Sequence, residues 1–441
     1  MEFDGLGCAR PCGQFSAGPK PGESFMPDEK EARLHLDKSE QLARSVRRRG
    51  RRRLVLILSL LMAALVVLAA LLYSQRALVR GLLTGSHFVG GNAAVARLHL
   101  PPGFSATVFA QGLSAPRFIT FSPEGTLFVA ERGTGSIVAL PDPTHSGKAA
   151  RRVVVVSGLD DPTSLVFYQG ALYVGEASRV TRFTLDASFH VTSRKVIVPN
   201  LPTGGNHVTR TVLIGPDGRL YVSIGSSCNV CIESDPRRAT VMVFNLDGSG
   251  GRIYARGLRN AVGMAINPWN NQIWVTNNGR DLMGDDTPPE TIYALQDGGN
   301  YGWPRCHAGD IIDPDYGHPG DCRGVVQPLV KMQAHSAPLG LVFYTANQFP
   351  AHYHGLFVAF HGSWNRTVPT GYKVVFIPLD SHGAVAGPVE DFATGWLLNN
   401  NDATGRPVGL AIDPQGSLYV SDDKGGYIYR ISYTAAPTVD P

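Results

Sequence analysis

Histidine, arginine and asparagine side chains recur at the starts of segments that share one sequence pattern. His207 and Arg210 lie in GGNHVTR, Arg259 and Asn260 lie in GLRNAVG, and Arg406 lies in GRPVG. A neutral imidazole titrates near physiological pH, so a histidine at such a point can serve as a general base. Guanidinium groups bind carboxylates through paired, charge-assisted hydrogen bonds. Because no carboxylate matches these arginines, their convergence predicts an anionic ligand beside a proton-accepting histidine.

Other polar residues follow an apolar run instead of preceding one. Asn278 comes directly after QIWVTN, and His361 and Arg366 belong to HGSWNR, which follows GLFVAF. Each of them could have only a local role, because a lone histidine can bond the backbone of its loop and an isolated arginine can pair with a neighbour. Their equivalent places in several repeats favour one shared site.

The segment RDLMGDDTPPE (280–290) is rich in carboxylates. Asp281, Asp285 and Asp286 could supply oxygen ligands to a hard cation such as calcium, which takes about six to eight oxygens. The spacing is not that of an EF-hand. The segment predicts a calcium site, and the alternative is a solvated acidic loop.

These residues need a scaffold that brings distant loops together, and the sequence contains a repeat of that kind. Leu127, Leu172 and Leu220 occupy equivalent positions about 45–50 residues apart, and the pattern continues at Ile273, Leu356 and Leu418. Each unit joins an alternating apolar strand to an aromatic-rich strand through a turn such as PEG, PDG or PQG. The high content of glycine (50) and proline (31) suits many short strands with tight turns. We therefore expect an all-β fold, a six-bladed β-propeller over residues 95–434, with an insertion at about 279–334 between the fourth and fifth blades.

The N-terminal part of the chain has a different character. Residues 54–73 form an apolar run of transmembrane length, and seven arginines crowd the ten positions before it. The positive-inside rule then predicts a single-pass signal anchor in the cell membrane, with residues 1–53 as a disordered basic cytoplasmic tail and the rest exported. A cleaved signal peptide is the alternative. Residues 74–94 would be a linker and 435–441 a tail. The net charge of +4 arises from this local cluster, so a nucleic-acid partner is not expected.

Four cysteines fall in the exported part. Cys228 and Cys231 form a C-x-x-C motif, and Cys306 and Cys322 form a second local pair. Export favours two structural disulfides, with a zinc site or a redox-active pair as alternatives.

Over residues 95–434 the chain resembles the quinoprotein glucose/sorbosone dehydrogenases. The resemblance is carried, in order, by LPPGFSATVFA, NHVTR, GPDGRLYVSIGS, GLRNAVG, RDLMGDD, GGNYGWP, HSAPLG, HGSWNR and GRPVG. SSCNVC and HGSWNR are closer to the sorbosone branch. The resemblance implies a six-bladed propeller that holds pyrroloquinoline quinone near its axis, with calcium on the quinone's carbonyl side.

The resemblance also implies residue roles. His207 matches the catalytic base, which takes a proton from the sugar's anomeric hydroxyl while a hydride passes to the quinone C5, and Arg259 would stabilise the quinone oxygen. The backbone carbonyls of Gly279 and Arg280 would reach calcium. The residues expected to contact the cofactor or line its pocket are Arg210, Asn260, Asn278, His335, Arg366 and Arg406.

Two departures bear on the substrate. Glucose-oxidising members have Pro-Gln where this chain has Ala261-Val262, and Gly-Pro where it has Gly279-Arg280. We therefore expect an aldose or related sugar other than glucose. No C-x-x-C-H haem motif is present, so electrons would pass to an external quinone or cytochrome. A non-enzymatic binding scaffold and a metal-dependent lactonase are the alternatives.

Overall fold

The computed structural model describes residues 59, 61–62, 91–398 and 402–435. The chain divides into two compact units, Met1–Val79 and Arg80–Pro441. The predicted cytoplasmic tail, most of the predicted anchor and nearly all of the C-terminal tail lie outside the described residues, as does the linker up to residue 90. Among the described residues, no helix is both long and apolar enough to cross a membrane.

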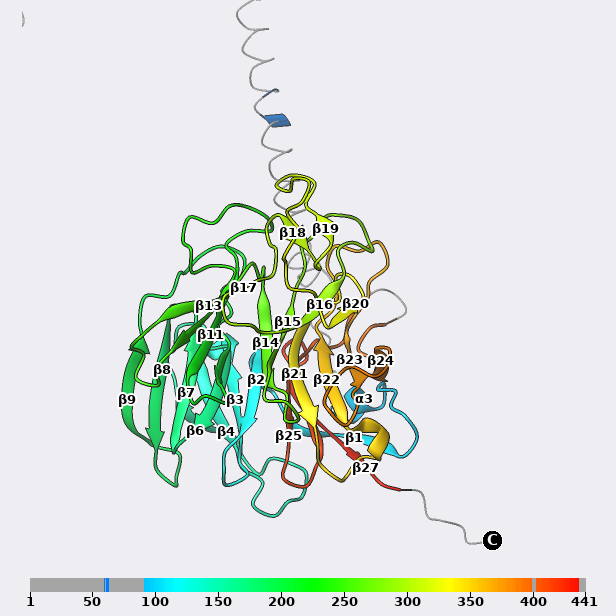
Figure 1. Cartoon of the computed structure of the whole chain (residues 1–441). Helices are drawn as coiled ribbons and strands as arrows, with labels where there is room; N and C mark the ends of the chain where they lie inside the picture. Colours follow the sequence, from blue (N-terminus) through cyan, green and yellow to red (C-terminus); the bar gives the residue numbers. More distant parts are fainter. Residues whose placement is uncertain (1–58, 60, 63–90, 399–401, 436–441) are drawn as a thin grey trace, which may run out of the picture. The chain divides into compact units, whose positions relative to one another are not determined.

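Six antiparallel sheets of four principal strands form the second unit, which confirms the predicted propeller (Figure 1). Blade one consists of β2 (Pro116–Phe121), β3 (Leu127–Glu131), β4 (Ser136–Leu140) and β5 (Val153–Val156). Blade two consists of β6 (Ser164–Tyr168), β7 (Ala171–Glu176), β8 (Arg179–Leu185) and β9 (Val191–Val198). Blade three consists of β10 (Val212–Ile214), β11 (Leu220–Ile224), β12 (Thr240–Phe244) and β13 (Arg252–Arg256). Blade four consists of β14 (Ala261–Ile266), β15 (Ile273–Asn277), β16 (Glu290–Ala294) and β20 (Val330–Met332). Blade five consists of β21 (Pro338–Tyr344), β22 (Gly355–Phe360), β23 (Lys373–Pro378) and β24 (Glu390–Ala393).

The sixth blade joins the two ends of the propeller. It contains β25 (Pro407–Ile412), β26 (Leu418–Asp422) and β27 (Tyr427–Tyr433), and its outer strand is β1 (Phe104–Gln111), which follows the short helix α3 (Gly91–Val95). β1 pairs antiparallel with β27, so that Phe104 lies opposite Tyr433. Because the first strand completes the last blade, the ring of blades is closed without a free edge between its ends.

The core lies between neighbouring blades rather than within one of them. The second strand of each blade is buried along its length, as in β11, because both faces of its sheet pack against other blades. Between blades two and three, for example, Tyr173 and Val180 pack with Val222 and Met242. Each second strand thus has a fixed position, and the loop that follows it starts from a rigid element.

A long insertion interrupts blade four. It runs between β16 and β20 and contains β17 (Gly299–Asn300), which pairs in parallel with β13, and the small hairpin of β18 (Cys306–His307) and β19 (Ile311–Ile312). Figure 1 shows β18 and β19 at the top of the view, beyond the ends of the blades. The predicted position between blades four and five was therefore wrong, because β20 returns after the insertion to complete the fourth sheet.

Candidate active site

His207 lies in the loop before β10 and has a defined tautomer. Its Nδ1 lies 2.8 Å from Ser226 Oγ and 3.0 Å from the Ser226 carbonyl oxygen. The Ser226 hydroxyl donates its own hydrogen to the Cys228 carbonyl at 2.7 Å, so both Ser226 oxygens accept from the ring. Nδ1 therefore carries the hydrogen, and Nε2 keeps a lone pair with no partner among the described residues.

The surroundings of His207 keep its imidazole neutral. Burial lowers the pKa of His207 to about 3, and the positive charges of Arg259, Arg238 and Arg210 act in the same direction. An imidazole of this kind is unprotonated at every physiological pH. It can accept a proton at Nε2 without first having to lose one.

Gly225 allows His207 and Asn260 to approach its backbone closely. A Cβ added to Gly225, directly after β11, would lie 2.5 Å from His207 Cβ and 2.8 Å from Asn260 Oδ1. His207 and Asn260, from loops of two blades, therefore both pack directly on this glycine. The sequence interpretation missed Gly225, although a glycine directly after an apolar strand is a usable signal for close backbone approach.

Arg259 lies buried at the start of blade four with its guanidinium bonded on two edges. Its Nε donates to the Asn229 carbonyl at 2.9 Å, and its Nη2 donates to Asn229 Oδ1 at 2.9 Å and to Asp281 Oδ2 at 2.7 Å. Its Nη1 donates to the Asn278 carbonyl at 3.3 Å. Asp281, predicted as a calcium ligand, thus supplies the counter-charge of Arg259.

Two asparagines continue the site toward blade five. Asn260 Nδ2 lies 3.4 Å from Asn278 Oδ1, and Asn278 Nδ2 donates to the Pro338 carbonyl at 2.7 Å. Both side chains are partly exposed. The structure therefore brings His207, Arg259, Asn260 and Asn278 together, as the sequence predicted.

A buried carboxyl group holds the loop that follows β15. Glu290 Oε2 accepts a hydrogen bond from the Gly279 amide at 2.7 Å, and Oε1 accepts one from the Ala337 amide at 3.2 Å. Burial raises the pKa of Glu290 to about 7 although these two bonds oppose the shift. The carboxyl group joins the loop of Gly279 to the loop of His335.

Arg280 does not turn its side chain toward the site. Its guanidinium forms ion pairs with Asp313 and Asp315 in the insertion, and Asp313 also accepts a hydrogen bond from His307 Nε2 at 2.7 Å. Burial opposes the ionisation of Asp313, but Arg280 and His307 outweigh it and hold the pKa of Asp313 at about 2. The insertion thereby anchors the backbone of residues 279–281.

The acidic loop is tied to blade five instead of forming a cation cage. Arg366 pairs with Asp286 at 2.8 Å and donates to the Asp285 carbonyl, while Asp285 Oδ1 accepts from the Thr367 amide at 3.0 Å. Within the described residues, the only group of three or more His, Cys, Asp or Glu ligands close to one another consists of Cys228, Cys231 and Glu233. In the described part of the chain, the carboxylates of Asp281, Asp285 and Asp286 form no such group, so the structure does not bring these predicted calcium ligands together.

His335 lies between these loops. Its Nε2 donates to the Gly284 carbonyl at 2.8 Å, and its Nδ1 lies 3.4 Å from Asn365 Nδ2 and 4.0 Å from Asp281 Oδ1. The imidazole is buried, whereas Asn365 is partly exposed. His335 thus lines the site from the blade-five side.

The last cluster comes from blades five, six and one. Arg406 donates to the carbonyls of His361 at 3.0 Å and Gly362 at 2.7 Å, and it forms no ion pair with a described residue. His361 Nε2 lies 2.9 Å from Asp423, whose other partner is Arg117 at 2.6 Å. Burial, together with Arg406, lowers the pKa of His361 to about 4. The sequence interpretation missed Arg117 and Asp423, although Arg117 follows an SAP motif like the one at 336–338, where β21 begins.

Arg210 stabilises the backbone of the loop around His207. It is fully buried, and its guanidinium donates to the carbonyls of Pro202, His207 and Thr209. Arg238, which the sequence interpretation also missed, donates to the Thr203 carbonyl at 2.5 Å and the Gly204 carbonyl at 3.0 Å. The two guanidinium groups hold the loop that carries His207. Because Arg210 is buried, its side chain is not accessible for the ligand contact that was expected of it.

The arginines were expected to lack carboxylate partners, but the structure shows that most of them have one. Arg117, Arg259, Arg280 and Arg366 all form ion pairs, and Arg406 is the predicted site arginine that keeps an accessible charge without one. Both predicted disulfides are confirmed, Cys228–Cys231 beside the site and Cys306–Cys322 in the insertion.

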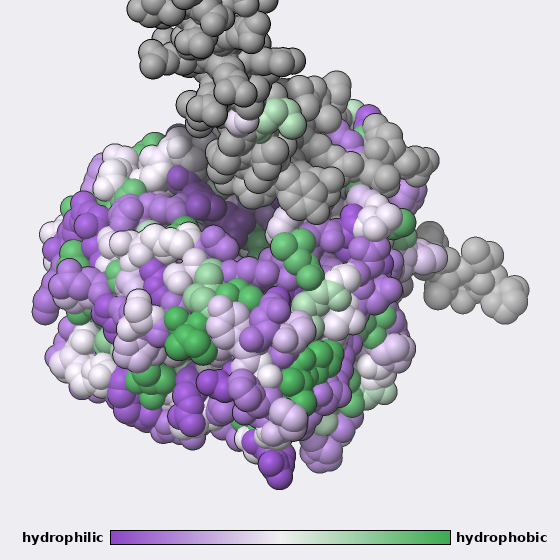
Figure 2. Space-filling model, turned by 90° about the horizontal axis from the view of Figure 1, so that it is seen from above, coloured by the Kyte–Doolittle hydropathy of each residue, from purple (hydrophilic) through white to green (hydrophobic). Residues whose placement is uncertain are grey.

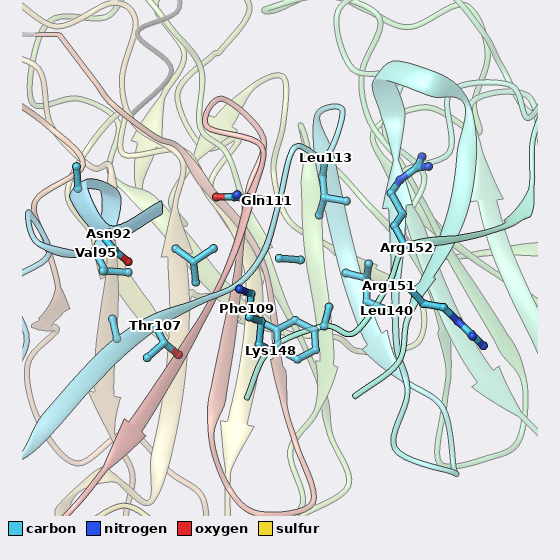
Figure 3. A pocket seen from close by; sticks show the side chains of 15 residues that line it. Asn92, Val95, Thr107, Phe109, Gln111, Leu113, Leu140, Lys148, Arg151 and Arg152 are labelled. Atoms are coloured by element: carbon cyan, nitrogen blue, oxygen red, sulfur yellow. The ribbon is translucent and has the colours of Figure 1, made fainter. Parts of the chain in front are cut away.

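The described part of the propeller has a surface hollow and a separate cavity. The face seen from above carries a hollow bordered by hydrophilic residues (Figure 2). A cavity of about 820 Å³ lies elsewhere, against α3, β1 and the connection from β4 to β5, and Lys148 and Arg151 line it together with Phe109 (Figure 3). It contains none of the predicted site residues, so the loops around His207 remain the candidate site.

Two known proteins that resemble this chain each match more than three quarters of it. The chain is 29% identical over 370 residues to an uncharacterised protein of Borreliella burgdorferi, covering 80% of this chain and 95% of that protein. It is 28% identical to a pyrroloquinoline quinone-dependent pyranose dehydrogenase of Coprinopsis cinerea, covering 78% of this chain and only 56% of that enzyme's length.

A solved structure shares the fold. The holo form of the pyrroloquinoline quinone domain of the Coprinopsis cinerea pyranose dehydrogenase superposes with a TM-score of 0.66 at 25% identity, over 76% of this chain and 97% of that domain. The TrAA12-like family model matches residues 98–315 and 317–434. Because this model covers most of the chain, the chain belongs to the TrAA12-like family.

Proposed function

We propose that this protein is a pyrroloquinoline quinone-dependent sugar dehydrogenase that oxidises a pyranose or related aldose. The observation that carries the proposal is the His207 imidazole, whose Nδ1 is bonded to Ser226 and whose Nε2 has no hydrogen-bond partner among the described residues. The relative in Coprinopsis cinerea that acts on pyranoses supports it, and so does membership of the family.

The residues present fit an anionic quinone cofactor. Arg406 keeps a positive charge without an ion pair among the described residues, and its guanidinium lies 5.5 Å from the Tyr372 ring centroid. Asn365 Oδ1 is buried without a hydrogen-bond partner among the described residues, so it could accept from a donor group of a bound molecule. Arg406 would hold a cofactor carboxylate, while Asn260 and Asn278 would meet the polar edge of the quinone. When bound, pyrroloquinoline quinone supplies a two-electron acceptor.

The protein residues supply proton transfer and electrostatic stabilisation. His207 accepts the proton of the sugar hydroxyl at Nε2, and Ser226 keeps the ring in the required tautomer and orientation. Arg259 has a fixed orientation through Asn229 and Asp281, so its charge needs no reorganisation when negative charge develops nearby.

Calcium fits the backbone of the loop after β15. The carbonyl oxygens of Gly279 and Arg280 accept no hydrogen bond from another described residue, so both are available to a cation. We propose these two carbonyls as calcium ligands, with no part for the carboxylates of Asp285 and Asp286.

The substrate proposal rests on the positions that depart from the glucose-oxidising pattern. Ala261 and Val262 are buried, and Val262 packs with Leu339 and Val408. These side chains offer no polar group to a sugar, which supports an aldose other than glucose. We further propose that electrons pass to an external acceptor. Residues 54–73 would anchor the protein in the membrane, with the propeller outside the cytoplasm.

The test uses the purified full-length protein with pyrroloquinoline quinone and calcium. Reduction of an artificial electron-acceptor dye is followed across a panel of aldoses, with His207→Ala beside the wild type. We expect sugar-dependent reduction that needs the cofactor and falls about 100-fold or more in the variant. Tight quinone binding should persist in His207→Ala, because the imidazole acts on the substrate. Absence of quinone binding by calorimetry would refute the proposal and favour a binding scaffold.

A further inference from the structure

Asn229 bonds to three other parts of the chain through its side-chain amide and its backbone carbonyl: Arg259, Asp281 and Trp303. Its carbonyl oxygen accepts from Arg259 Nε at 2.9 Å and from Trp303 Nε1 at 3.3 Å. Its Oδ1 accepts from Arg259 Nη2 at 2.9 Å and from the Asp281 amide at 2.8 Å, while its Nδ2 donates to the Asp281 carbonyl at 2.9 Å. No other described residue contacts both the predicted catalytic arginine and the backbone of the Asp281 loop in this way.

The contacts with Arg259 define the orientation of its guanidinium. Nε and Nη2 form one edge of the planar fork, and Asn229 meets that edge with two oxygens, one from its backbone and one from its side chain. A planar group bonded twice along one edge cannot rotate about its axis without breaking both bonds. The opposite edge, which carries Nη1, is thereby turned toward Asn278.

The contacts with Asp281 require an amide. Asn229 accepts from the nitrogen and donates to the oxygen of the same residue, as one strand does with another. A carboxylate could accept from the Asp281 amide but could not donate to its carbonyl. Asn229 therefore also positions the backbone that leads from Gly279 to Asp281.

A disulfide fixes Asn229 itself. Cys228 and Cys231 close a four-residue ring around it, and the Cys228 carbonyl accepts the Ser226 hydroxyl that orients His207. Glu233 holds the start of this segment, because it accepts from the Ser227 amide at 2.6 Å and from the Ser227 hydroxyl at 2.7 Å. The segment is only partly buried, so the covalent ring restricts a loop that packing alone would leave freer.

We propose that Asn229, held in the Cys228–Cys231 ring, is a positioning residue for the dehydrogenase reaction: it sets the orientation of Arg259 and the path of residues 279–281. This inference rests on the proposed function for its effect on turnover. Its effect on Arg259 is independent of the reaction and can be measured in the protein alone.

The first measurement is the reactivity of Arg259 toward phenylglyoxal in the full-length protein without cofactor, followed by peptide mass spectrometry. Asn229→Ala should raise the rate of modification at Arg259 about tenfold or more, because two charge-assisted hydrogen bonds are lost. Asn229→Asp keeps both oxygens and should leave Arg259 protected, which guards against a variant that merely unfolds. Asn245→Ala, in the turn between β12 and β13, is the matched control and should match the wild type.

The second measurement is steady-state turnover with the cofactor loaded. Asn229→Ala should lower kcat by about tenfold to 100-fold with the sugar KM changed less than about threefold, and Asn229→Asp should recover part of kcat. Cys228→Ser with Cys231→Ser should raise Arg259 labelling by less than Asn229→Ala does, and wild-type labelling would remove the ring from the proposal.

The outcomes separate the two proposals. Unchanged labelling of Arg259 in Asn229→Ala overturns the positioning role, whatever the activity. If Asn229→Ala increases the labelling of Arg259 while the wild-type protein neither binds the quinone nor turns over sugars, the positioning role is supported and the proposed function is refuted. Increased labelling together with a loss of kcat supports both.

Discussion

Replacement of Glu290 by glutamine should remove a pH dependence of stability that the site itself creates. Glu290 is 3% exposed, and its two oxygens accept the amides of Gly279 and Ala337. Glutamine fits the same space and carries no charge. One of its two terminal groups is an NH₂, which would face a backbone amide, so one hydrogen bond is lost at every pH.

The magnitude follows from the shift in the Glu290 pKa. Burial raises that pKa from 4.5 to about 7 in the folded protein. Between these values the unfolded chain has released its proton while the folded protein retains it, so the free energy of unfolding falls as pH rises. A shift of this size corresponds to about 3 kcal/mol in full, of which about 2–3 kcal/mol is lost between pH 5 and pH 8. Above about pH 8 the loss levels off.

The assay is urea denaturation of the full-length protein at pH 5 and pH 8. The difference in unfolding free energy between the wild type and Glu290→Gln should change by about 2–3 kcal/mol between the two pH values, in favour of glutamine at pH 8. Glu124→Gln, an exposed glutamate in the turn between β2 and β3, controls for the loss of one surface charge. An unchanged difference for Glu290→Gln would mean that the carboxyl group is ionised in the folded protein, which would refute the reasoning.

Three further predictions concern the site and its supports. Because the pKa of His207 is about 3, kcat/KM should show no acid limb near pH 6.5, and a pH–rate profile with such a limb would point to another base. Asp313→Asn leaves Arg280 and His307 without their shared carboxylate and should cost about 3–5 kcal/mol of stability by chemical denaturation. The depressed pKa of Asp313, about 2, also predicts that its stabilising effect is lost as pH falls from about 4 to 2, which acid titration of the wild type against the variant would detect. Removal of the Cys306–Cys322 disulfide by paired serine substitution should destabilise the protein by about 3 kcal/mol without changing quinone affinity, measured by calorimetry and thermal unfolding.

Much of the scaffold could be read from the sequence, because a propeller blade is specified locally. Turn residues and alternating apolar positions recur within each unit, and the first three units are spaced about 45–50 residues apart before the spacing lengthens. These features predicted six blades and the loops that follow Leu220 and Ile273. The disulfides were predicted for the same reason, since each joins cysteines close in the chain. The one error of topology, the insertion placed between blades, arose because β20 is three residues long and lies after the insertion.

The site divides between the two kinds of information. The residue types of His207, Arg259, Asn260 and Asn278 and their places in the repeat predicted a common site, and the structure brings them together. The partners of the arginines could not be predicted, since Arg366 meets Asp286 across 80 positions of sequence. Such pairs depend on how loops from different blades bend toward one another.

The sequence by itself determined which residues stand at the ends of the blades, because strand and turn patterns act over short distances along the chain. Only the tertiary structure decided which charges remain free. It neutralised Arg259 and Arg366 with carboxylates, buried Arg210, and left Arg406 without an ion pair among the residues described. It also gave Asn229 its contacts. The physical reason is that a hydrogen bond or ion pair requires atoms within about 3 Å, and that distance is set by the packing of separate loops on a closed ring of blades.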